Sequence, residues 1–233
     1  MEFKDIASVV ALVISLVSLF ISLRQKKHET ERTIREKLTD TFTKITAMDV
    51  ELIKLEMNIN KNINLTRIFN QQRRFLVNQA QYFLPKIERL VSDSEYALLA
   101  NTLERTGDLE SADYYWRKSI EKSSNKLNKI YNIRGYARFL FKFKNFNQGR
   151  KMYQEAVDMS TRENDKDVYD LADTYILWGA LEREHGFFDK AEEYFDLAGR
   201  MINKIESEGQ KQRLKNYLND IKQVNYPNVI SSN

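Results

Sequence analysis

The sequence predicts an all-α protein: one N-terminal transmembrane helix, then a long heptad helix and an array of helical hairpins. Three observations lead to this fold class. The 233-residue chain contains only 7 Gly and 2 Pro, which leaves little material for tight β-hairpins or glycine-rich loops. It starts with a long uncharged apolar stretch, and one pattern of small and aromatic residues recurs three times between residues 93 and 205. Apolar positions elsewhere follow a helical period.

Composition limits the function classes. Charged residues make up 30% of the chain, and the net charge of +4 comes from interspersed signs, which favours a solvated surface and argues against a nucleic-acid partner. The absence of cysteine excludes disulfides and thiolate metal sites. We expect four segments: an anchor (1–23), a basic linker with membrane-proximal helices (24–92), three hairpins (93–205) and a capping helix with a tail (206–233).

The segment Ile6–Leu23 carries no charge over 18 residues, and as a helix it would be roughly 27 Å long, near the thickness of a bilayer's hydrocarbon core. Acidic and basic residues precede it, unlike the basic start of a signal peptide, so we expect an uncleaved anchor rather than a buried core helix. Six Lys or Arg fall between Arg24 and Lys37, whereas Lys4 alone precedes the segment. The positive-inside rule therefore predicts a single-pass protein with its N-terminus outside and its C-terminal domain in the cytoplasm.

Two groups of anchor residues are candidates for contacts. Basic residues just after the span are positioned to meet anionic lipid: Arg24, Lys26 and Lys27. Small residues within the span could allow two anchors to approach closely: Ala11, Ser15, Ser18 and Ser22. The alternative is that these serines are merely tolerated, so a homo-oligomer is possible and not required.

A heptad seam follows the basic linker. Its apolar positions alternate at spacings of four and three: Ile34, Leu38, Thr41, Ile45, Met48, Leu52, Leu55 and Ile59. Phe42 and Ile53 widen the stripe, which favours packing within a bundle over a parallel coiled coil between chains. A second helix is expected from about Leu65, and Pro85 should interrupt it.

The repeated pattern consists of a turn, a small residue, an aromatic residue four positions later and a small residue three beyond that. The three sets are Ala112, Trp116, Ser119; Gly149, Tyr153, Ala156; and Ala191, Phe195, Ala198. Each preceding helix contributes a large residue followed by a small one: Leu99-Ala100, Tyr136-Ala137 and Trp178-Gly179. Small residues let two antiparallel helices come close, and the aromatic ring fills the space to the next unit.

This pattern resembles the tetratricopeptide repeat family over residues 93–205, most closely in RTGDLESA, the turn from Arg105 to Ala112. The resemblance implies a right-handed array of helical hairpins that binds proteins. The chain departs from the family in two respects. Its small-residue anchors are 37 and 42 residues apart rather than 34, with longer loops expected around Asn125 and Asn164, and Glu182 occupies a position that is usually apolar. A capping helix is expected over 213–224.

Arg134, Arg138 and Lys142 are spaced four apart and should form one ridge on a helix. In the family, this helix lines the concave groove, and Asn101 and Arg105 of the preceding unit would lie nearby. The resemblance therefore implies a basic groove suited to an acidic peptide. The alternative is a solvated basic face. The chaperone-binding carboxylate clamp of the family is not reproduced.

Catalytic chemistry has few candidates, and we expect no enzyme, cofactor or metal site. His28 and His185 are expected to be exposed, and no HExxH, GxSxG or P-loop pattern occurs. The segment 134–151 interleaves aromatic and basic residues, as nucleic-acid-binding surfaces do, but the repeat register assigns much of its aromatic content to the core. The sequence therefore predicts a membrane-tethered protein-interaction scaffold. Its alternatives are a conditional membrane effector that acts by oligomerisation and an RNA-binding helical repeat.

Overall fold

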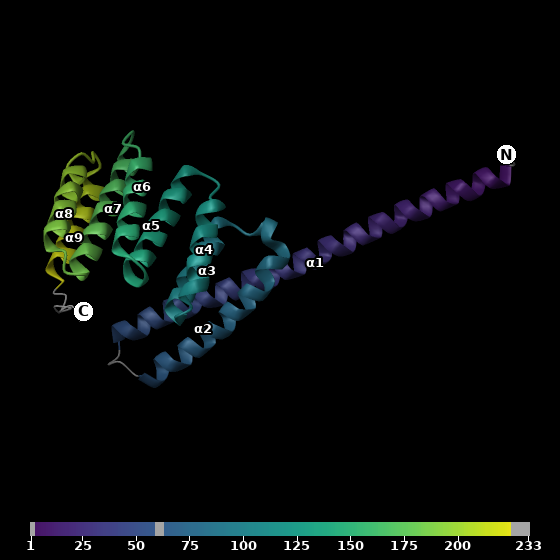
Figure 1. The fold of residues 1–233 in the computed structure, drawn as a ribbon, viewed down its shortest axis with the longest axis horizontal. Helices are drawn as coiled ribbons and strands as arrows, with labels where there is room; N and C mark the ends of the chain where they lie inside the picture. The colour runs from purple at the N-terminus through teal and green to yellow at the C-terminus, as the bar shows by residue number, and fades with distance from the viewer. Residues whose placement is uncertain (1–2, 59–62, 225–233) are drawn as a thin grey trace. The chain divides into compact units, whose positions relative to one another are not determined.

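The computed structural model describes the backbone of residues 3–58 and 63–224, and the side chains of residues 12–54 and 67–224. Every regular element in these ranges is a helix, as predicted (Figure 1). The chain divides into two compact units, Met1–Val91 and Ser92–Asn233, called here the N-terminal unit and the repeat unit. The division lies between residues 91 and 92, and the boundary expected from the sequence lies between residues 92 and 93.

The N-terminal unit is a helical hairpin. It consists of α1 (Phe3–Asn58), α2 (Ile63–Phe83) and the short 3₁₀ helix η1 (Leu84–Leu90). The part of α1 after the apolar segment lies antiparallel to α2 (Figure 1). Since α1 contains neither Gly nor Pro, nothing in its sequence breaks the helix. The expected anchor and heptad helix are therefore one continuous helix, without a linker between them.

The heptad seam packs within the chain. Four of its members are at most 6% exposed: Leu38, Thr41, Ile45 and Met48. They belong to the part of α1 that contacts α2, which buries Phe69, Val77 and Ala80. The intramolecular interpretation is thus confirmed for this stretch, while Leu55 and Ile59 lie outside the residues whose side chains are described. The proline interruption is also confirmed, because α2 ends at Phe83 and Pro85 lies in the first turn of η1.

The repeat unit contains three helical hairpins and one further helix. Its helices are α3 (Asp93–Thr106), α4 (Leu109–Glu121), α5 (Lys126–Phe143), α6 (Phe146–Met159), α7 (Asp165–Glu184), α8 (Phe188–Ile202) and α9 (Glu208–Gln223). The hairpins α3–α4, α5–α6 and α7–α8 stack side by side, and α9 covers α7 and α8 (Figure 1). The predicted hairpins are confirmed, and the last helix starts five residues before its expected position.

Polar caps fix the starts of these helices. A capping box starts α3: the Ser92 side chain accepts a hydrogen bond from the Glu95 backbone amide, and the Glu95 carboxylate accepts one from the Ser92 amide. Asn125 and Asn164, around which longer loops were expected, end the loops before α5 and α7 as the N-caps of these helices. The wider repeat spacing is partly taken up by helix length, because α5 has 18 residues and α7 has 20, against 14 in α3.

Close helix contact at small residues holds each hairpin together, as the repeat pattern predicted. A Cβ atom on Gly149 would lie 2.5 Å from the Phe141 ring, and one on Gly179 would lie 2.7 Å from the Phe195 ring. Within the α7–α8 hairpin, the ring of Trp178 stacks on Tyr194 with a centroid distance of 3.9 Å. The same ring stacks on Tyr153 of α6 at 5.4 Å, which joins this hairpin to the preceding one. Glycine and aromatic positions together therefore set the spacing of α5 to α8.

Candidate binding groove between α5 and α7

The three basic residues of the predicted ridge lie together on one side of α5. Arg134, Arg138 and Lys142 all line the same surface pocket, which has a volume of about 370 Å³. The opposite side of α5 is held in the core by Ile133 and Ala137, both 0% exposed. The pocket, called here the ion-pair groove, is lined by Tyr131, Arg134, Gly135, Arg138, Lys142, Tyr153, Leu177, Ala180, Leu181 and Glu184.

Each base of the ridge faces a carboxylate on a neighbouring helix. The guanidinium of Arg134 is hydrogen-bonded to Asp173 of α7. The guanidinium of Arg138 is hydrogen-bonded to Glu104 of α3. Lys142 has the loosest pair, with 3.9 Å between its Nζ and the Glu184 Oε1. These pairs connect α5 to the first helix of both neighbouring hairpins.

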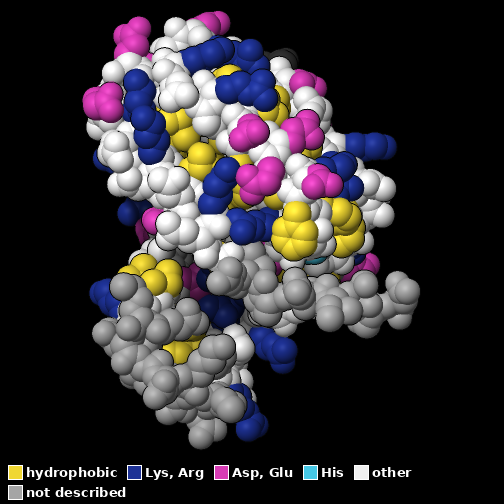
Figure 2. Space-filling view, turned by 90° about the vertical axis from the view of Figure 1, so that its left-hand side faces the viewer, with side chains coloured by type: hydrophobic (Ala, Val, Ile, Leu, Met, Phe, Trp, Pro, Cys, Tyr) yellow, Lys and Arg dark blue, Asp and Glu magenta, His cyan; other side chains and the backbone are white. Residues whose placement is uncertain are grey.

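The groove therefore carries balanced charge, which differs from the basic surface expected from the sequence. Partly buried charges are costly to desolvate unless they are paired, so the ridge requires acidic neighbours. The sequence does contain a signal for them: Glu104 and Asp173 lie 34 and 39 residues from the arginines that they pair with, close to the repeat spacing. Figure 2 shows a face of the molecule on which basic and acidic side chains are similarly interspersed.

Arg134 is the most enclosed base in the groove. Its side chain is 7% exposed, and its Nη1 has no hydrogen-bond partner among the described residues. The Tyr131 ring lies 5.5 Å from the Arg134 guanidinium carbon, and the Tyr131 hydroxyl donates a hydrogen bond of 3.0 Å to Asp170. Burial and this hydrogen bond raise the pKa of Tyr131. Contacts within the chain therefore hold the Arg134 guanidinium in place.

Glu104 of α3 is the acidic partner of Arg138. Burial raises the pKa of its carboxyl, and the nearby Arg138 opposes this rise without cancelling it. The Arg138 Nη2 also lies 3.5 Å from the Asn101 Oδ1, so Asn101 is joined to the ridge as predicted. Arg105 is exposed at the end of α3 and does not line the groove.

Glu182, which departs from the family pattern, lies in the core behind the groove. Its side chain is 0% exposed, and both of its oxygens accept hydrogen bonds from Arg150, at 2.8 and 2.6 Å. The Trp178 Nε1 donates a third hydrogen bond at 3.0 Å. The charge is tolerated because its acceptors are satisfied by three donors, two of which reach across from α6.

Seven residues that line the groove were not among the site residues expected from the sequence: Tyr131, Gly135, Tyr153, Leu177, Ala180, Leu181 and Glu184. Leu177, Ala180 and Glu184 are spaced three and four apart, so they share one side of α7, and this spacing was the available signal. They remained hidden because no sequence pattern shows which side of α7 turns towards α5.

The two histidines differ in their surroundings. His185 is the C-cap residue of α7 and lies in the α7–α8 turn, but it is half-buried, with its ring 4.9 Å from that of Phe146, so the expectation of an exposed side chain is wrong. The packing of the α5–α6 turn against the α7–α8 turn causes the difference. His28 is exposed on α1, with its Nδ1 3.9 Å from Glu31. No cluster of His, Cys, Asp or Glu suited to a metal ion occurs within the described part of the chain.

The candidate membrane contacts lie along the first part of α1. Arg24, Lys26 and Lys27 are exposed, as are the side chains of Ser15, Ser18 and Ser22, whereas that of Ala11 lies outside the described residues. Among the residues that the structure describes, no helix has an apolar stretch long enough to cross a membrane. The first six residues of the predicted span, 6–11, lie outside the described side chains.

Comparison with known protein families and with curated proteins finds no match to this sequence. The class of the protein is therefore described by its architecture: it is an all-α protein whose helical hairpins stack like repeats and carry the ion-pair groove.

Proposed function

We propose that the protein is a membrane-tethered interaction scaffold of the tetratricopeptide repeat type, which recruits a cytosolic protein through the ion-pair groove. The observation that carries this proposal is a pocket of about 370 Å³ whose loosest ion pair, Lys142 with Glu184, is accessible on both sides. An extended peptide can supply a carboxylate to Lys142 and place an apolar side chain beside Leu177 and Ala180.

The charges of the groove narrow the chemistry of the partner. Arg134 and Arg138 are engaged in tight pairs, while the Lys142–Glu184 pair is long and about 39% exposed on both sides. Lys142 is therefore the residue best able to exchange its partner for an acidic group on a peptide. An acidic peptide remains our first candidate, with its carboxylate at Lys142 and its apolar residues deeper in the groove.

The test should leave the internal ion pairs intact. Reversing all three bases to Glu would leave Asp173 and Glu104 facing like charges, so loss of binding would not be informative. We would instead place a photo-crosslinking amino acid at Leu177, with the exposed Glu155 of α6 as the control position. We expect one defined protein to crosslink from position 177 and not from 155, and Lys142→Glu to weaken this crosslink. Equal yields from both positions would contradict the proposal.

The tether is proposed to be the apolar start of α1. Its large hydrophobic side chains from Leu12 to Leu23 are 49 to 65% exposed and lie on all sides of the helix, a larger apolar surface than a water-exposed helix normally presents. We expect the full chain to resist carbonate extraction from membranes and a chain lacking residues 1–23 to be extracted. We further expect a tag at the N-terminus to be accessible from outside and one at the C-terminus to be protected.

A conditional membrane effector is the second candidate. Ser15, Ser18 and Ser22 share one exposed side of α1, and the unbroken helix couples this segment directly to the part of α1 that packs against α2. If the serines gather several spans into a disrupting cluster, expression should lower the membrane potential, and Ser15→Leu with Ser18→Leu should restore it. An unchanged potential at high expression of the wild type would eliminate this candidate.

A further inference from the structure

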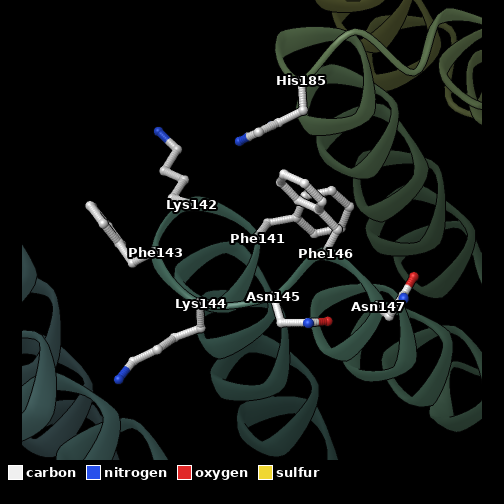
Figure 3. A pocket seen from close by; sticks show the side chains of 8 residues that line it. All are labelled: Phe141, Lys142, Phe143, Lys144, Asn145, Phe146, Asn147 and His185. Atoms are coloured by element: carbon white, nitrogen blue, oxygen red, sulfur yellow. The ribbon is translucent and has the colours of Figure 1, made fainter. Parts of the chain in front are cut away.

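A second pocket lies at the turn between α5 and α6. It has a volume of about 410 Å³, and we call it the turn pocket (Figure 3). Its lining residues are Phe141, Lys142, Phe143, Lys144, Asn145, Phe146, Asn147 and His185. It shares only Lys142 with the ion-pair groove. Its volume falls within the range of small-molecule sites.

Aromatic rings form much of the pocket. The Phe146 ring lies 5.9 Å from that of Phe141 and 4.9 Å from that of His185, so the three rings make one packed cluster. Phe141 is buried, but Phe146 and Phe143 remain 39% and 41% exposed. In Figure 3, Phe141 and Phe146 lie together below His185. The exposed rings offer flat apolar surface for a planar ligand.

The charge of the turn pocket is positive, unlike that of the groove. Two of its eight lining residues are lysines and none is acidic. Lys142 extends towards the same space as His185, and Lys144 leaves the turn on the other side (Figure 3). Within the described part of the chain, Lys144 has no ion pair, and Lys142 has only its long pair with Glu184.

Polar groups for edge recognition are also available. The side-chain oxygens of Asn145 and Asn147 accept hydrogen bonds from Gln148 and Arg150, which leaves both amide NH₂ groups as donors. The His185 Nδ1 lies 2.8 Å from the Leu181 carbonyl oxygen. Because a carbonyl can only accept, Nδ1 carries the hydrogen, and the Nε2 of the neutral ring is an acceptor.

These features explain the aromatic and basic residues that the sequence analysis noticed between 134 and 151. Tyr136, Leu140 and Tyr153 are at most 6% exposed and belong to the core, as the repeat register predicted. Phe139 and Phe141 are also buried, whereas Phe143 and Phe146 remain partly exposed at the turn beside Lys142 and Lys144. The core thus does not account for this part of the segment.

We propose that the turn pocket binds a free mononucleotide. The base lies against the exposed part of the Phe146 ring, and the base edges are read by the asparagine amides and His185. Lys142 neutralises the phosphate, and Lys144 adds to the positive charge around the turn. The site shares Lys142 with the groove, but it does not depend on the protein-binding role proposed for the groove.

The test is a titration of the full-length protein in detergent micelles, followed by saturation-transfer NMR. The probes are AMP, GMP, CMP and UMP. Two comparison compounds are used: ribose 5-phosphate, which lacks the base, and adenosine, which lacks the phosphate. We expect saturable binding of at least one mononucleotide and weaker binding of both comparison compounds. Phe146→Leu, which keeps apolar volume but removes the flat ring, should weaken binding on the order of tenfold.

Charge is tested by a matched pair of double variants. Lys142→Gln with Lys144→Gln should weaken nucleotide binding on the order of tenfold. Lys122→Gln with Lys126→Gln, at the end of α4 and the start of α5, should leave it unchanged. Equal losses in both, tight binding of ribose 5-phosphate, or no saturable binding of any mononucleotide at low salt would overturn the proposal. A single-stranded hexaribonucleotide that binds when no mononucleotide does would also overturn it, in favour of an RNA surface.

Discussion

At the scale of single residues, the deviations from the repeat pattern carry the most information. Glu182 occupies a position expected to be apolar, yet it is fully buried and held by Arg150 and Trp178. A buried ion pair is tolerated in the fold only when both partners are present, because either partner alone would be an uncompensated buried charge. The pair therefore joins α6 to α7 at one defined position, next to the groove.

Removing one member should be more harmful than removing both. We expect Glu182→Ala to lower the free energy of unfolding by about 3–5 kcal/mol, because Arg150 would lose its partner while remaining largely buried. The double variant Arg150→Met with Glu182→Leu should lose clearly less, since apolar groups fill the same space. Chemical denaturation measures both, and a double variant as unstable as Glu182→Ala would contradict this account.

Asp165 gives a prediction for pH dependence. Its oxygens accept hydrogen bonds from the backbone amides of Glu206 and Ser207, at 2.9 and 2.8 Å, and these bonds lower its pKa. Because the folded pKa lies below the unfolded one, this stabilisation is present at neutral pH and is lost as the pH falls below about 4. We expect Asp165→Asn to flatten the fall of Tm with acidification. The exposed Asp196→Asn, which removes no such bond, should leave that slope unchanged.

At the scale of elements, glycine and alanine positions determine how near paired helices can come. The hairpin α5–α6 depends on Gly149, whose position leaves no room for a side chain beside Phe141. Gly199 of α8 has open space instead, since a methyl group there would have no neighbouring atom within 4 Å. The same residue type thus has a packing role at one site and none at the other.

This contrast gives a paired prediction. Gly149→Ala should destabilise the protein by about 1–3 kcal/mol, because Phe141 or the whole of α6 must move. Gly199→Ala should stabilise it by about 0.5–1 kcal/mol, since it only removes backbone freedom from a helix. Thermal unfolding of the two variants should shift in opposite directions, and a shift in the same direction would show that close approach is not the cause.

At the scale of the whole molecule, the chain is two units with separate cores. The repeat unit buries its own cluster of residues between α7, α8 and α9, including Leu171, Ile176, Ile202 and Leu214. The N-terminal unit has its own seam between α1 and α2. Each unit therefore has the apolar contacts needed to fold by itself.

A fragment of residues 92–233 should accordingly fold alone. We expect it to be helical by circular dichroism and to unfold in one cooperative transition, because the packing among α3 to α9 is retained. A fragment ending at residue 205 should be less stable, since it lacks α9 and exposes the residues that pack against Leu214. A helical but non-cooperative 92–233 fragment would show that the N-terminal unit is required for packing.

The sequence by itself determined the helical class, the position of each hairpin and the intramolecular use of Leu38, Thr41, Ile45 and Met48. These features follow from local rules: helical periodicity, capping residues such as Ser92, and the need for small residues where helices meet. Only the tertiary structure decided the charge of the groove, the burial of Glu182 and the placement of His185. Ion pairs such as Arg134–Asp173 join residues 39 positions apart, and their existence depends on which sides of α5 and α7 face each other. The repeat pattern predicted the order of these helices, and tertiary packing determined how each helix is rotated about its own axis relative to its neighbours.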